Sequence, residues 1–204
     1  MVKIGTYIRG INWVYSSLFR ILFSRSFWHF GRAVKIRFPD AIEGAEHISI
    51  GSNTLIGRHA FLAAHPLSNS CNEPLLKIGS NCLLGRSGHI YACESIILGN
   101  DVLTGSNVYI ADYTHSFEDH CQPIHKQDVL STGPISIGDG TWLANNVCII
   151  GASVGKNCVV GANAVVLDDI PDFCIAVGSP ARIVKRYDTN FKKWRSVNTF
   201  GEYT

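Results

Sequence analysis

The chain has 204 residues, 46% of them hydrophobic, and its eighteen Lys and Arg against sixteen Asp and Glu give a net charge of +2. This length and composition suit one domain with modest additions. They do not favour nucleic-acid binding, because no recognisable motif supports it, and no apolar run reaches the ~20 residues that span a bilayer. The seven cysteines include no CxxC pair, so we expect reduced packing residues in a cytoplasmic protein, not disulfides or metal ligands.

Residues 1–38 form the first predicted element, a helical cap. They contain seven Lys or Arg and no acidic residue, whereas the rest of the chain has a net charge of −5. Helical spacing places five apolar side chains on one face: Ile8, Ile11, Tyr15, Leu18 and Leu22. Two interpretations stay open: the helix covers the open first coil of a repeat structure, or it also rests on an anionic membrane surface. Arginines interrupt the apolar stretch, which argues against a secretory signal.

From about residue 42 to residue 171, a compact, mostly apolar residue returns every six positions, usually followed by glycine or alanine. The anchors are Ile50, Ile56 and Leu62; Ile78, Leu84 and Ile90; Leu98, Thr104 and Ile110; Ile137, Leu143 and Ile149; and Val154, Val160 and Val166. A second small residue, such as Cys82 or Cys158, often stands four positions after the anchor. A fixed six-residue repeat predicts a parallel β-helix with three short strands and three turns per coil. The glycine fits the backbone of a corner.

Two segments interrupt the repeat. Residues 66–77 contain Pro66, Asn69, Asn72 and Pro74 and predict a short surface loop. Residues 113–136 form a longer excursion that contains His115, His120 and His125 as well as several acidic residues. A structureless excursion of this length in a compact repeat is usually functional, so residues 113–136 are the predicted active-site loop.

The C-terminal half of the chain resembles the hexapeptide-repeat O-acetyltransferases. The resemblance rests on residues 137–144 (IGDGTWLA), 159–165 (VVGANAV), 169–171 (DIP) and 178–182 (GSPAR). Residues 88–92 (GHIYA) and 108–115 (VYIADYTH) are similar to the branch acting on sugars of cell-surface polysaccharides. The match covers roughly residues 42–187. It implies a left-handed β-helix over residues 39–181, with a basic extension at 182–204, and a homotrimer with acetyl-CoA bound in the clefts between subunits.

Three residues depart from the family pattern. Ala144 stands where glycine is usual and Ser179 where asparagine is usual, and both are small enough to be tolerated. Tyr113 stands where the polysaccharide branch often has another histidine. This last departure bears on the choice of acceptor more than on the chemistry.

His115 is the predicted general base, because a hydroxyl is a weak nucleophile until a positioned imidazole removes its proton. It follows the third coil, where the long loop begins, and it matches the catalytic histidine of the family. Asp112 could orient the imidazole or bind a sugar hydroxyl, or it could be an exposed corner residue; Glu118 is a weaker candidate for the same role. His89, on the preceding coil, is either an acceptor-site residue or an exposed turn histidine.

The family resemblance implies that the pantetheine arm of the coenzyme lies along stacked turns. Ala144 and Ala162 match those positions, where bulky side chains would block the arm. Asn145 could hydrogen-bond the amides of the arm, and Trp142 could form a wall of the cleft.

The same resemblance implies a phosphate site near the C-terminus. Arg182 and Lys185 match basic residues near the coenzyme phosphates, where a fixed positive charge is useful, and Ser179 precedes them in the same signature. The other interpretation of these two cations is a solvated basic tail. No metal is expected.

Two other functional classes remain as alternatives. A γ-type carbonic anhydrase shares the left-handed scaffold and binds zinc through three histidines across a subunit boundary, here His89, His115 and His120. A non-catalytic trimeric scaffold or sugar-binding module is the second. For an acetyltransferase, the leading acceptor is a sugar hydroxyl of a capsule, exopolysaccharide or O-antigen precursor. Galactosides, maltose, serine and antibiotics are the other acceptors.

Overall fold

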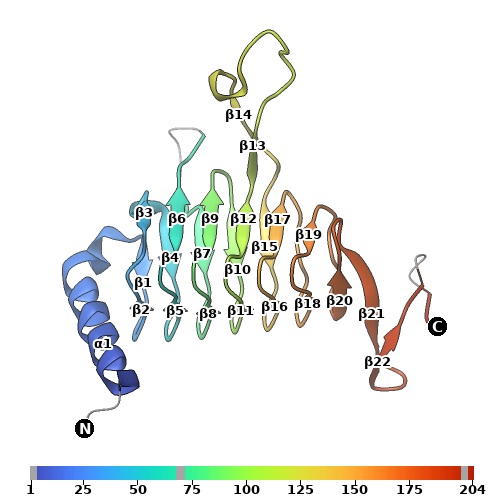
Figure 1. Cartoon of the computed structure of the whole chain (residues 1–204), viewed down its shortest axis with the longest axis horizontal. Coiled ribbons are helices and arrows are strands. Elements are labelled where there is room, and N and C mark those ends of the chain that lie inside the picture. The colour runs from blue at the N-terminus through green and yellow to red at the C-terminus, as the bar shows by residue number, and fades with distance from the viewer. Residues whose placement is uncertain (1–3, 68–71, 199–201) are drawn as a thin grey trace.

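The computed structural model describes residues 4–67, 72–198 and 202–204, with side chains from residue 10 onward in the first helix. Lys3, Asn69 and the side chains of Ile8 and Arg9 lie outside the described part. The strands stand side by side along the molecule, with α1 (Ile4–Phe23) at one end and the C-terminal strands at the other (Figure 1). Among the described residues, no helix combines the length and the apolar character needed to cross a bilayer.

Three sheets of parallel strands make up the repeat. The first sheet contains β1 (His29–Phe30), β4 (Ile48–Ile50), β7 (Leu76–Ile78), β10 (Ile96–Leu98) and β15 (Ile135–Ile137). The parallel part of the second contains β2 (Lys35–Ile36), β5 (Leu55–Ile56), β8 (Leu83–Leu84), β11 (Leu103–Thr104), β16 (Trp142–Leu143), β18 (Val159–Val160) and β20 (Cys174–Val177). The third contains β3 (Ala41–Glu43), β6 (Phe61–Ala64), β9 (His89–Ala92), β12 (Tyr109–Ala111), β17 (Cys148–Ile150) and β19 (Val165–Val166). The chain visits the sheets in turn, so three consecutive strands make one coil.

The register between coils confirms the predicted hexads. Ile50 pairs with Ile78, which pairs with Leu98, which pairs with Ile137, so anchor lies on anchor through the stack. Every predicted anchor is buried. Burying a side chain of this size is worth roughly 1.5–3 kcal/mol, and this narrow apolar stack therefore supplies most of the stability of the coils.

Small polar residues inside the stack find hydrogen-bond partners within it. Thr54 Oγ1 donates to the carbonyl of Gly79 (2.7 Å) and accepts from the backbone N–H of Cys82 (3.1 Å). Thr141 makes the equivalent pair of bonds at the same corner, three coils further along the second sheet. Cys82 and Cys158 are buried and free, as predicted, and burial raises the pKa of the Cys158 thiol to about 11.

Glycine and asparagine have different structural roles at the corners between strands. The glycines after the anchors allow close stacking of successive coils: a Cβ on Gly85 would overlap the carbonyl oxygen of Gly105. Among the described residues, asparagine takes more of the left-handed backbone positions than any other residue type, and Asn107, Asn146 and Asn163 have φ between 59° and 61°. Asn107 donates to Asn146, which donates to Asn163, both at 2.9 Å. The expectation that the glycine after an anchor serves the corner conformation is therefore corrected: these glycines serve the stacking.

Helix α1 packs across the first coil, and the 3-10 helix Ser24–Ser26 follows it. Tyr15 stacks on Phe38 with ring centroids 3.9 Å apart, and the buried Ser16 hydroxyl donates to the carbonyl of Ile36 at 2.8 Å. Arg20 Nη1 donates to the carbonyl of Gly31 at 2.9 Å. Apolar burial by one helix face is thus supplemented by polar contacts to the first coil.

The apolar face predicted for this helix is wrong in its details. Tyr15 packs inward, but Ile11, Leu18 and Leu22 are 39%, 52% and 66% exposed. The helix has apolar residues on two faces, and periodicity alone does not show which of them meets the coil.

The C-terminal extension folds into antiparallel strands that continue the second sheet. After the cis Ser179–Pro180 bond, β21 (Arg182–Asp188) pairs with β20 and with β22 (Lys193–Ser196). The buried Asp188 carboxylate accepts from the backbone N–H groups of Asn190 and Phe191 and pairs with Arg195 at 2.9 Å. These bonds hold the turn between the last two strands.

Candidate functional site

The long insertion leaves the coils as a β-hairpin. After β12, strand β13 (Tyr113–His115) pairs antiparallel with β14 (Val129–Ser131), and the hairpin stands off the row of coils in Figure 1. A 3-10 helix, Ile124–Lys126, lies between the two strands, and β15 resumes the repeat. The predicted structureless loop therefore has a regular base that fixes the direction of the side chains on it.

His115 lies on this base and is exposed. It pairs in register with Val129, and its ring meets the ring of Tyr113 edge-on, with centroids 6.3 Å apart and an interplanar angle of 86°. The imidazole is thus held by a strand and remains open to a substrate.

Asp112, three residues earlier, is fully buried. Its carboxylate accepts from the backbone N–H groups of Cys93 (2.7 Å), Glu94 (2.9 Å) and Ser95 (2.8 Å). The expectation of an exposed corner aspartate is wrong. The carboxylate holds the turn at residues 93–95 beside the hairpin, because three backbone donors occupy its two oxygens.

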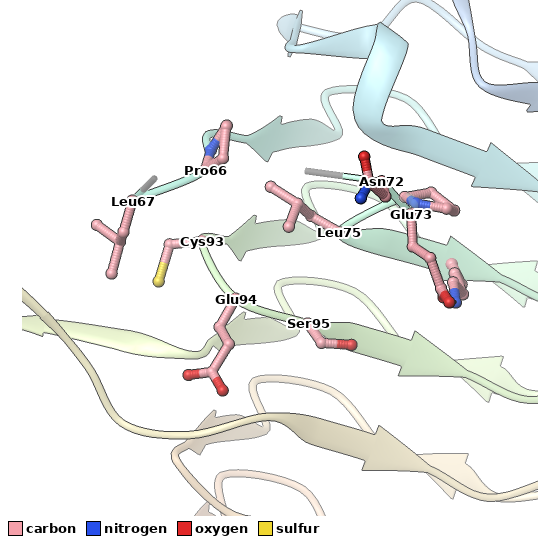
Figure 2. A pocket seen from close by; sticks show the side chains of 10 residues that line it. Pro66, Leu67, Asn72, Glu73, Leu75, Cys93, Glu94 and Ser95 are labelled. Carbon is pink, nitrogen blue, oxygen red and sulfur yellow. The ribbon is translucent and has the colours of Figure 1, made fainter. Parts of the chain in front are cut away.

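A hollow of about 550 Å³ opens beside this turn. Figure 2 shows Cys93, Glu94 and Ser95 along one segment, with Pro66 and Leu67 on the left of the view and Asn72 and Glu73 on the right. Burial, together with the Asp112 carboxylate, raises the pKa of the Cys93 thiol to about 12. Ser131 of β14 hydrogen-bonds to the Glu94 carboxylate, so the hairpin is tied to the wall of this hollow.

Aromatic rings form a continuous row across the third sheet and end at His115. His89 is half-buried on β9, stacks on Phe61 (5.9 Å between centroids) and hydrogen-bonds through Nδ1 to the Tyr91 hydroxyl at 3.2 Å. Tyr91 contacts the rings of Tyr109 (5.6 Å) and Tyr113 (6.3 Å). We call Phe61, His89, Tyr91, Tyr109 and Tyr113 the aromatic row.

The aromatic row joins predicted and unpredicted residues. The predicted residues His89 and Tyr113 lie on it and the predicted His115 lies at its end. His89 is on a strand and not in an exposed turn. Phe61, Tyr91 and Tyr109 were missed. Each of them stands directly beside a buried hexad anchor (Leu62, Ile90 or Ile110) and therefore points to the opposite side of its strand, which is the signal that could have found them. Burial raises the pKa of Tyr91, Tyr109 and Tyr113, so their hydroxyls stay protonated and can donate.

The remaining loop residues lie further out. Glu118 is exposed beyond the strand. Among the described residues, the group of His, Cys and acidic side chains close enough to share a metal ion is Asp119, His120 and Cys121, all exposed. His89, His115 and His120 are not grouped in this way within one chain, so the carbonic anhydrase alternative would need histidines from two subunits.

The predicted coenzyme residues lie at the corner between the second and third sheets. Trp142 is exposed on β16, and Ala144 and Asn145 form the turn that follows. Asn145 Oδ1 accepts from the backbone N–H of Ser106 at 2.8 Å, which leaves the amide nitrogen as its free donor group. Ala162 is exposed in the next turn.

The basic residues of β21 border a second hollow of about 510 Å³. Arg182 and Arg186 line it, and the exposed Arg182 pairs with Asp168 at 3.1 Å. Lys185 and Ser179 are exposed, and neither is among the residues that line this hollow. The structure thus joins Arg182 to Arg186, which was not among the predicted site residues.

Comparison with known proteins places these features in a family. The family described as "Hexapeptide repeat of succinyl-transferase" matches residues 76–111 and 134–168. A protein of Escherichia coli K12 named "Putative lipopolysaccharide biosynthesis O-acetyl transferase WbbJ" is 31% identical over 181 residues, which are 85% of this chain and 88% of that protein. The chain belongs to the hexapeptide-repeat acetyltransferase family. It is accordingly an enzyme of the acyltransferase class.

Two further similarities concern proteins named as acyltransferases. "Probable acetyltransferase Rv3034c" of Mycobacterium tuberculosis is 33% identical over 165 residues, covering 80% of this chain and 51% of that protein, so the chain spans about half the length of this relative. The N-acyltransferase AntD of Bacillus cereus, solved with dTDP-4-amino-4,6-dideoxyglucose and coenzyme A, superposes with a TM-score of 0.69 at 20% identity. The alignment covers 84% of this chain and 90% of AntD, and it shows that the two share a fold.

Proposed function

We propose that the protein transfers the acetyl group of acetyl-CoA to a hydroxyl of a sugar in the biosynthesis of a surface polysaccharide. The observation that carries the proposal is the exposed His115 at the end of the aromatic row. The name of WbbJ supports an O-linked product in lipopolysaccharide synthesis. The sugar nucleotide and coenzyme A in AntD support the pairing of these two substrate classes on this fold.

The aromatic row suits a sugar acceptor. The apolar C–H face of a pyranose packs on the negative face of an aromatic ring, and the protonated hydroxyls of Tyr91 and Tyr113 can donate to sugar oxygens. A sugar seated on Tyr91 and Tyr113 presents a hydroxyl to His115, the next ring of the series.

His115 then acts as the general base. Its neutral imidazole takes the proton of the sugar hydroxyl while the oxygen attacks the thioester carbonyl carbon. The tetrahedral intermediate expels the coenzyme A thiolate, and the imidazolium returns the proton to the sulfur. The products are the sugar acetate and free coenzyme A, with His115 again neutral.

The coenzyme is assigned to the corner formed by the turns at Ala144 and Ala162, with Trp142 beside it. Small side chains there leave room for the pantetheine arm, and the free amide nitrogen of Asn145 can donate to it. Arg182 and Arg186 suit the phosphates of the coenzyme, once a phosphate replaces Asp168 as the partner of Arg182. Lys185 and Ser179 are exposed in the same C-terminal region.

A homotrimer of left-handed β-helices completes the proposal. The hairpin with His115 follows β12, whereas the turn at Ala144 precedes the neighbouring parallel strand β17. The two therefore lie at opposite ends of the strands of the third sheet. A neighbouring subunit is needed to bring a donor turn to a hairpin. Family membership supports both the trimer and the left-handed winding. Acetyl-CoA is a cytoplasmic metabolite, and the free cysteines support the same compartment.

The test is acceptor-dependent release of coenzyme A thiol from acetyl-CoA. The panel contains nucleotide sugars, lipid-linked oligosaccharides, galactosides, maltose, serine and chloramphenicol. We expect release with a sugar acceptor, and mass spectrometry should find one acetyl group on its oxygen. Thiol release that no sugar stimulates would overturn the proposal, and carbon dioxide hydration with bound zinc would replace it with the anhydrase alternative.

A further inference from the structure

Helix α1 keeps a second apolar face that the first coil does not cover. This outer stripe consists of Ile11, Val14, Leu18, Ile21 and Leu22, which are between 39% and 75% exposed. Their spacing of three, four, three and one residues places them on one side of a helix. The inner side is occupied by Tyr15, Ser16 and Phe19, which contact the first coil and the segment leading to it.

The outer stripe borders an apolar hollow of about 530 Å³ between helix and coil. Ile11, Val14 and Leu18 line one side of it, and the ring of Phe38 lines another. The exposed indoles of Trp13 and Trp28, at 68% and 50%, lie on the same N-terminal segment. An apolar stripe accompanied by exposed tryptophans is typical of helices at a membrane interface.

The positive charge of the N-terminal segment favours an anionic lipid over a second copy of the chain as the partner of this surface. Residues 1–38 contain seven basic and no acidic residues, whereas the rest of the chain has a net charge of −5. Arg25, Arg32 and Lys35 of this segment are exposed. A second copy of the segment would bring cation against cation, but anionic lipid headgroups attract each Lys or Arg near the surface.

We infer that residues 10–28 are a docking surface for a bilayer containing anionic phospholipid, with α1 lying along the interface. The outer stripe enters the boundary between headgroups and acyl chains, and the basic residues meet the headgroups. The inner face stays on the first coil. The inference is independent of acyl transfer, because binding to vesicles requires neither acetyl-CoA nor an acceptor.

Vesicle flotation with the full chain tests it, using phosphatidylcholine with and without phosphatidylglycerol. Leu18→Asp and its matched control Leu167→Asp change residues of the same type that are both 52% exposed. We expect the wild type and Leu167→Asp to float with the anionic vesicles, and Leu18→Asp to lose roughly tenfold or more in binding. Raising the salt concentration should release the wild type.

Ile21→Asp serves as a second variant in case Leu18→Asp fails to fold, since Ile21 is 75% exposed. Equal flotation of wild type and both stripe variants would overturn the inference. Sedimentation of the same samples tests whether a second copy of the chain occupies this surface instead. If the stripe variants dissociate a wild-type oligomer and the wild type ignores anionic vesicles, the stripe is an interface between copies.

Discussion

Asp112 and His115 are three residues apart, yet the fold gives them opposite environments. Asp112 is the last residue held by the coil, and its carboxylate is buried against three backbone N–H groups. His115 has left the coil and is exposed on β13. One side chain therefore maintains the shape of the site, and the other is free to take part in proton transfer.

Replacing His115 with alanine should lower kcat by roughly 10²–10⁴-fold, which is the usual contribution of a positioned general base. The melting temperature should not change, because the side chain is exposed. Steady-state thiol release and thermal unfolding measure the two effects. His120→Ala, an exposed change in the same hairpin, is the control, and near wild-type turnover in His115→Ala would exclude the proposed base.

Asp112→Ala should lower the free energy of unfolding by about 2–3 kcal/mol, because the backbone donors at Cys93, Glu94 and Ser95 lose their acceptor. Asp112→Asn keeps an acceptor oxygen and should lose less. Urea unfolding measures both, with the exposed Glu118→Ala as a control for surface changes. If Asp112→Ala is as stable as the wild type, the carboxylate does not hold this turn.

Arg182→Ala combined with Arg186→Ala should raise the KM for acetyl-CoA and leave kcat at saturation near the wild-type value. The reason is that phosphate contacts are made equally in the ground state and the transition state. Lys185→Ala, which changes a residue outside the lining of this hollow, should have a smaller effect on KM. A fall in kcat with unchanged KM would contradict the assignment of this hollow to the phosphates.

Individual elements differ in how far the sequence predicts them. The hexads predict the coils because each anchor repeats the same geometric position, and register then follows. The two faces of α1 are not distinguished, because both are apolar and the inward one depends on Ser16 and Arg20 finding specific carbonyls. The aromatic row is missed because Phe61, Tyr91 and Tyr109 become neighbours only when successive coils stack.

The residues of the candidate site also differ in how far the sequence predicts them. His115 is predicted by its place after a coil and by family resemblance. Arg186 is missed because its place beside the hollow depends on how β21 pairs with β20, and the sequence there predicts only a basic extension. The antiparallel base of the hairpin is missed because its residues are mostly exposed and carry no apolar periodicity.

The stacking role of glycine can be tested within one coil. Gly85→Ala should destabilise the protein by about 1–3 kcal/mol, the usual cost of overpacking, because the new Cβ meets the backbone of Gly105. At Gly88 the nearest atom to a new Cβ is the carbonyl oxygen of Val108, at 3.9 Å, so Gly88→Ala should be close to neutral. Thermal unfolding of both variants measures the difference, and equal melting temperatures would contradict the stacking explanation.

For the whole molecule, the separation of His115 from the donor turn predicts sites shared between subunits. His115→Ala destroys the base, and Ala144→Trp blocks the donor turn, so each homotrimer should be inactive. Trimers reassembled from a mixture contain some sites that take His115 from one variant and the donor turn from the other. We expect the mixture to recover part of the wild-type turnover, measured after unfolding and refolding together.

The control for this experiment mixes the two variants without unfolding them, so that subunits do not exchange. Recovery only after refolding together supports shared sites. An active Ala144→Trp homotrimer would remove the donor turn from the proposal, and sedimentation of the wild type as a monomer would remove the trimer.

Because the coils stack at a uniform spacing, the number of coils sets distances along the molecule. In the third sheet, β3, β6, β9 and β12 are successive neighbours, so three spacings of about 4.8 Å separate the coil beneath α1 from the coil that carries the hairpin. Adding or removing one coil, which is three hexads, between them would move His115 by one such spacing relative to α1. The immediate surroundings of His115 would stay the same. With α1 on a bilayer, the number of coils sets the height above the lipid at which a sugar is modified.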